Sequence, residues 1–145
     1  MENRDEFLLN EIYRNVRMAT WAIDTIYDAI QDQGLRDLVD KQNDVYEELT
    51  HSCEELSAKL DIDLKDINPI EKGMSWMGIK MGTLTNKETS HIAEKLIQGT
   101  TMGITQMITT VADSKCENKE IREIANHLKR NEEVFIEGLK EFLMK

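Results

Sequence analysis

The stretch DIDLKDINPIEKGMSWMGIKMGTLT, residues 61–85, decides how the rest of this chain can fold. Its Asn68-Pro69 pair is a strong helix start, because an N-cap residue stands directly before a proline at the first helical position. Apolar residues then follow at heptad spacing: Ile70, Met74, Met77, Met81 and Leu84. We therefore predict a short helix over residues 70–84, which spans about 22 Å at 1.5 Å per residue. That length is enough to cross most of the height of a helical bundle.

Long segments with apolar residues three and four apart lie on both sides of this stretch, and strand-like alternation is absent. Before it we predict helices over residues 2–32 and 35–60, with Gly34 ending the first. After it we predict a helix over residues 85–113, which opens with the capping-box sequence TNKE, and a last helix over residues 118–145. The short turn within each pair makes its two helices antiparallel.

Two antiparallel hairpins of similar length joined by a long crossover have the connectivity of a ferritin-like four-helix bundle. We therefore expect an all-α chain of this type, with residues 70–84 as a short fifth crossover helix. A chain of 145 residues with 40% hydrophobic content matches one domain that buries a core without disulfides. The expected domain covers residues 1–145.

Charge and composition exclude several classes of partner. The 28 acidic and 18 basic residues give a net charge of −10, which repels nucleic acid and anionic lipid surfaces. No run of 18 apolar residues occurs, and the N-terminus is charged rather than signal-like. Cys53 and Cys116 form no C-x-x-C pair, so we expect two free thiols and a cytoplasmic protein.

Glu48 and His51 have the E-x-x-H spacing that di-iron bundles use to hold metal. On a helical wheel, however, Glu48 lies about 110° from the apolar stripe around Leu49, and His51 lies nearly opposite it. The remaining candidate ligands lie about 100° or more from their own stripes. They are Glu11, His91, Glu94, Glu123 and His127. We therefore predict that the motif faces solvent and holds no metal.

Glu132 is the acidic residue that points inward, about 40° from the stripe of the last helix. Turn counting along the expected helices places it near the level of Gln42, Tyr46 and Thr100. A buried carboxyl group must be hydrogen-bonded or protonated, and these three side chains are suitable partners. Two interpretations stay open: a polar layer that fixes helix register, or a minimal binding site.

The segment LIQGTTMGITQMITTVA, residues 96–112, carries no charge on any face, and such a helix is usually covered all round. Its Gly99 and Gly103 form a G-x-x-x-G pair, a pattern that lets helix backbones approach closely. We expect the crossover helix, with Trp76 and Met77, to cover part of this surface. A two-fold dimer contact is expected to cover the remainder.

Three stretches carry a resemblance that spans almost the whole chain. They are EFLLNEIYRNVRMAT at residues 6–20, SHIAEKLIQGTTMGI at residues 90–104 and NEEVFIEGLKEFL at residues 131–143. The chain resembles a group of small bacterial proteins in the ferritin-like superfamily. This resemblance implies the bundle fold and, in many members, iron, redox or stress-related roles. No metal-ligand assignment transfers, because the inward E-x-x-H pattern is missing.

The leading functional prediction is a non-enzymatic bundle without a cofactor or metal, which acts by homodimerisation or by binding a partner protein. An alternative is an iron- or manganese-dependent oxidase or peroxidase with non-standard ligands. Its ligands would come from Glu132, Glu94, His91, Glu48 and His51. A third hypothesis is a small-ligand binder lined by methionines and by Trp21 and Trp76.

Overall fold

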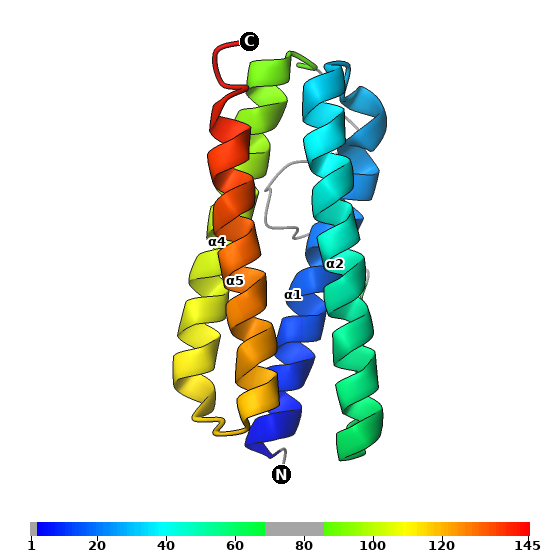
Figure 1. The fold of residues 1–145 in the computed structure, drawn as a ribbon, viewed down its shortest axis with the longest axis vertical. Helices are drawn as coiled ribbons and strands as arrows, with labels where there is room; N and C mark the ends of the chain where they lie inside the picture. Colours follow the sequence, from blue (N-terminus) through cyan, green and yellow to red (C-terminus); the bar gives the residue numbers. More distant parts are fainter. Residues whose placement is uncertain (1–2, 69–85) are drawn as a thin grey trace.

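A computed structural model describes residues 3–68 and 86–145 of the chain (Figure 1). These residues form helices and turns without any strand, so the predicted all-α class is confirmed for them. The helices are α1 (Arg4–Ile26), the 3₁₀ turn η1 (Tyr27–Ala29), α2 (Gln33–Leu60), α4 (Thr89–Ser114) and α5 (Lys119–Lys140). The predicted crossover helix, with Trp76 and Met77, lies outside the described residues.

The four long helices pack side by side around one core (Figure 1). α1 runs up in this view, α2 and α4 run down, and α5 runs up again. α1 packs against α2 and α4, and α5 packs against the same two helices, so each helix has antiparallel neighbours. The largest fully buried side chains include Tyr46 and Phe135. Among the described residues, no helix is long and apolar enough to cross a membrane.

The segment after α2 runs along the side of α1. The buried amide of Asn10 donates to the carbonyl of Asp63 at 3.1 Å and accepts from the backbone N–H of Lys65 at 2.7 Å. Further along, the Arg17 guanidinium lies 3.3 Å from the Asp66 carboxylate. Since Asn10 and Arg17 are about two turns apart on α1, this segment follows α1 toward the end of the bundle where α4 begins.

The turn between the first two helices differs from the prediction at both ends. α1 ends at Ile26 rather than at residue 32, because η1 tightens its last turn and Asp32 acts as the N-cap of α2. The Asp32 carboxylate accepts from the backbone N–H of Leu35 at 3.0 Å. The prediction that Gly34 ends the first helix was wrong. Gly34 lies in the first turn of α2, where a Cβ atom would lie 3.2 Å from the ring of Phe142.

The two helices of the second hairpin start and end within a few residues of the predicted limits. α4 begins at Thr89 rather than at residue 85, because the side chain of Asn86 accepts from the backbone N–H of Glu88 in a turn. α5 begins next to Asn118, close to the predicted start, and the Asn118 side chain caps it by accepting from the N–H of Ile121 at 3.1 Å. The last helix ends at Lys140, and the chain closes in turns rather than continuing as helix.

Candidate functional site

A carboxyl group lies in the centre of the bundle. Glu132 on α5 is 1% exposed, and its Oε2 accepts a hydrogen bond of 2.8 Å from the hydroxyl of Tyr46 on α2. Tyr46 is also 1% exposed. Both residues face inward because each belongs to the apolar stripe of its helix, where a polar group replaces a hydrocarbon side chain.

Gln42 and Thr100 are buried as well, at 5% and 1% exposure. Gln42 lies one turn before Tyr46 on α2, and Thr100 lies on α4. Within this group, three buried polar atoms have no hydrogen-bond partner among the described residues: Oε1 of Glu132, Nε2 of Gln42 and Oγ1 of Thr100. Buried polar atoms are nearly always hydrogen-bonded, so these three have unused capacity to bind a further polar group. All four predicted site residues are therefore interior, and their role in binding stays a prediction.

Asn15 and Gly103 complete this polar layer, which we define as Asn15, Gln42, Tyr46, Thr100, Gly103 and Glu132. The Asn15 amide donates to the Gly103 carbonyl at 3.2 Å. A Cβ atom on Gly103 would lie 3.7 Å from both Asn15 Oδ1 and Glu132 Oε2, so α1, α4 and α5 meet at this point. Asn15 also lines a pocket of about 110 Å³ between α1 and α4, and so connects the layer with the surface.

Burial controls the electrostatics of the layer. It raises the pKa of Glu132 from 4.5 to about 8, and the hydrogen bond from Tyr46 lowers this pKa in part. Burial also raises the pKa of Tyr46 well above its usual value, and the nearby Glu132 raises it further. The carboxyl group and the phenol are therefore both neutral at pH 7, and neutrality avoids the cost of desolvating a charge.

The E-x-x-H motif faces solvent, as predicted. Glu48 is exposed, and His51 is 73% exposed at its side chain with its Nε2 2.8 Å from Glu55 Oε1. Glu94 is exposed on α4, whereas Glu132 is interior, so the ligands of the alternative metal hypothesis are not brought together. Over residues 3–68 and 86–145, no group of three or more His, Cys, Asp and Glu side chains is arranged to hold a metal ion.

The two cysteines are free thiols, as predicted, and both are fully buried. Burial raises the pKa of Cys53 to about 12, and burial likewise raises the pKa of Cys116. Since the thiolate is the nucleophilic form of cysteine, neither residue is suited to covalent catalysis near neutral pH.

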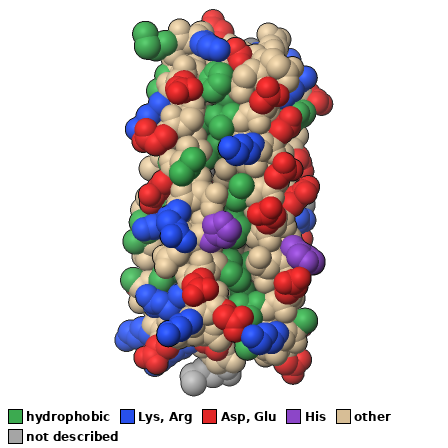
Figure 2. Space-filling view, viewed as in Figure 1, with side chains coloured by type: hydrophobic (Ala, Val, Ile, Leu, Met, Phe, Trp, Pro, Cys, Tyr) green, Lys and Arg blue, Asp and Glu red, His purple; other side chains and the backbone are tan. Residues whose placement is uncertain are grey.

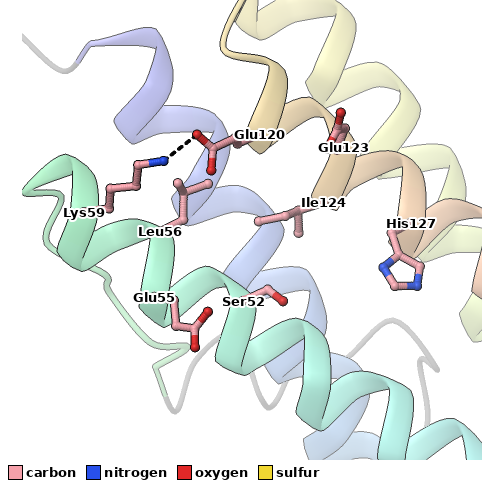
Figure 3. A pocket seen from close by; sticks show the side chains of 8 residues that line it. All are labelled: Ser52, Glu55, Leu56, Lys59, Glu120, Glu123, Ile124 and His127. Carbon is pink, nitrogen blue, oxygen red and sulfur yellow. Dashed lines mark hydrogen bonds and ion pairs between the residues drawn. The ribbon is translucent and has the colours of Figure 1, made fainter.

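A shallow groove of about 360 Å³ runs between α2 and α5 (Figure 3). Leu56 and Ile124 point toward each other across it, and Lys59 lies 2.8 Å from Glu120 at one end. Hydrophobic side chains are visible along the seam between these helices, bordered by charged residues (Figure 2). His127 lies at the other end of the groove. The ion pair and the charged borders are typical of a solvated helix–helix seam.

The surface of α4 that faces away from the core has a different character. Its exposed residues over 96–112 are Gln98, Thr101, Met102, Thr105, Gln106, Ile108, Thr109 and Ala112. Met102 is 56% exposed and Ile108 is 52% exposed. We call this set the outer face of α4; it carries no charged side chain. Gly99 and Gly103 are buried on the opposite side, so the G-x-x-x-G pair packs inward rather than on this surface.

Comparison of the chain with protein-family models, with curated proteins and with solved structures gives no match.

Proposed function

We propose that this chain is a ferritin-like four-helix bundle that acts without catalysis, by associating with a second copy of itself through the outer face of α4. One observation supports this most directly. The outer face presents exposed Met102 and Ile108 and no charge over residues 96–112. Exposed apolar surface of this kind is a common feature of protein interaction sites.

Electrostatics favours a second copy as the occupant. With a net charge of −10, two copies repel each other wherever their acidic surfaces meet. The outer face of α4 lets two copies approach without bringing like charges together, and a two-fold axis would place this face against itself. Packing Met102 and Ile108 against their counterparts would then remove apolar surface from water.

The course of the chain supports the ferritin-like part of the proposal. α2 and α4 run in the same direction, so the chain is back at the end of the bundle where α2 began when it enters α4 (Figure 1). The contacts of Asn10 with Asp63 and Lys65 lie along that return path. Two hairpins joined by one long crossover are the connectivity of this superfamily.

Sedimentation velocity over a wide range of protein concentration tests the association. We expect the parent protein to reach a dimer, and Met102→Lys to weaken dimerisation by about tenfold or more, since placing a charge in an interface readily costs the 1.4 kcal/mol this requires. Val134→Lys is the matched control, because Val134 is a 71% exposed apolar residue on α5 and the substitution changes the net charge equally. A parent protein that stays monomeric at every concentration, or equal weakening by both variants, would refute the proposal.

A further inference from the structure

The helix that carries the proposed association surface also touches the buried acid. Gly103 abuts Glu132 on the inner side of α4, and Met102, the next residue along the backbone, is exposed on the outer side. One turn of α4 therefore joins the polar layer to the outer face. A displacement of this turn would move both surfaces together.

Among residues 3–68 and 86–145, Glu132 has no charged partner that would stabilise its ionised form. Tyr46 from α2 is the titratable group that faces it, and it donates a neutral hydrogen bond. α1 presents the amide of Asn15, and α4 presents Gly103, with Thr100 one turn before it. No described group from these helices supplies a positive charge, and Oε1 of Glu132 lacks a donor among the described residues.

An ionised Glu132 would therefore need water. The pocket between α1 and α4 is the nearby route, because Asn15 lines it, and Asn15 and the carboxyl group both lie against Gly103. Near the layer, α4 presents the small residues Gly99, Thr100 and Gly103. Among the described residues, the hydrogen bond that joins α4 to α1 at this level runs from the Asn15 amide to the Gly103 carbonyl. Hydration would enter through this pocket, beside the bond from Asn15 to Gly103.

We propose that the proton on Glu132 controls self-association through α4. With the carboxyl group neutral, α4 lies close against Asn15 and Glu132 and presents its outer face for association. When Glu132 releases this proton to solvent, the carboxylate draws water into the seam between α1 and α4, this turn of α4 is displaced, and association weakens. This inference rests on the proposed function and adds its regulation by pH.

The direction of the pH effect follows from the environment of Glu132. Since burial raises the pKa of Glu132 to about 8, the neutral form is present below that pH and is lost above it. Association is therefore expected to be strong in mildly acidic and neutral solution and weaker in alkaline solution. The Tyr46 hydrogen bond lowers the pKa of Glu132, so Tyr46→Phe should move the transition to higher pH.

The test measures the dimer dissociation constant of the parent protein, Glu132→Gln and Tyr46→Phe by sedimentation at several pH values. Between about pH 6 and about pH 9.5 the dimer dissociation constant of the parent should rise by about tenfold, which is within the usual range of coupling between two sites. Glu132→Gln should change little, because a neutral amide loses no proton. Dimerisation of Tyr46→Phe should weaken as it does in the parent protein, but at higher pH.

The outcomes separate the two proposals. A parent protein that is monomeric even at the acidic end refutes the proposed function and this regulation with it. A dimer whose dissociation constant is constant with pH refutes the regulation alone, as does a pH response in Glu132→Gln equal to that of the parent. A Tyr46→Phe transition at lower pH than in the parent would also contradict it.

Discussion

Replacing Glu132 by glutamine should make folding less sensitive to pH. Glutamine matches glutamate in shape and still offers an oxygen to the Tyr46 hydroxyl, which lies 2.8 Å from Glu132 Oε2 in the parent protein. It cannot ionise. The comparison therefore isolates the proton on Glu132 from the packing around it.

The size of the effect follows from linkage. The folded-state pKa of Glu132 is raised from 4.5 to about 8. The protonated carboxyl group therefore makes its full contribution to stability below pH 4.5, and this contribution is lost as the pH rises to 8. At 1.36 kcal/mol per pKa unit, the total loss in the free energy of unfolding is roughly 5 kcal/mol, of which roughly 3 kcal/mol is already lost at pH 7. The stability of Glu132→Gln relative to the parent should therefore increase steadily across this window.

Urea unfolding followed by circular dichroism at about pH 5, 7 and 9 measures this difference. Glu133→Gln is the matched control, because Glu133 is the next residue on α5 and is 55% exposed at its side chain. Its stability relative to the parent should change by less than about 1 kcal/mol over the same range, as expected for an exposed ion pair. If the two glutamine variants show the same pH dependence, then Glu132 does not hold a proton in the folded protein and the reasoning is wrong.

Two further predictions concern residues away from Glu132. Asn10→Ala removes the hydrogen bonds that hold Asp63 and Lys65 beside α1, so it should lower the free energy of unfolding by about 1–3 kcal/mol in the same urea assay. A loss below about 0.5 kcal/mol would show that this segment is held by other contacts. Glu48→Ala and His51→Ala should each change stability by no more than about 0.5 kcal/mol, since both side chains are exposed. A larger fall in melting temperature that a chelator reproduces in the parent would overturn their solvent-facing placement.

Helical periodicity predicted most of the architecture, because a stripe of apolar residues determines which side of a helix enters the core. It was less informative about helix ends, which depend on contacts between segments distant in sequence. Gly34 resembles a helix stop in the sequence, yet it lies in the first turn of α2 where the ring of Phe142 comes close. The role of Asn10 was also missed, since its partners Asp63 and Lys65 are more than 50 residues away.

The candidate site was predictable only in part, for a related reason. Wheel analysis of the last helix found Glu132, which lies near its apolar stripe, and turn counting placed Gln42, Tyr46 and Thr100 at the same level. Asn15 lies at the edge of its stripe, and its contact with Gly103 depends on how α1 and α4 are rotated against each other. A wheel gives the direction of a side chain relative to its own helix, but the rotation of a neighbouring helix is set by packing.

The polar layer contains a group from every long helix, and this restricts how the helices can slide against each other. Asn15 comes from α1, Tyr46 from α2, Gly103 from α4 and Glu132 from α5. Moving one helix by a turn would place Glu132 or Tyr46 against aliphatic side chains and leave a buried polar group without its partner, at a cost of about 1–3 kcal/mol. The same contacts bring the carboxyl group of Glu132 against Gly103 on α4, the residue next to Met102. A role in register and a role in pH-dependent association are thus compatible in this layer, because the protonated form of Glu132 serves both.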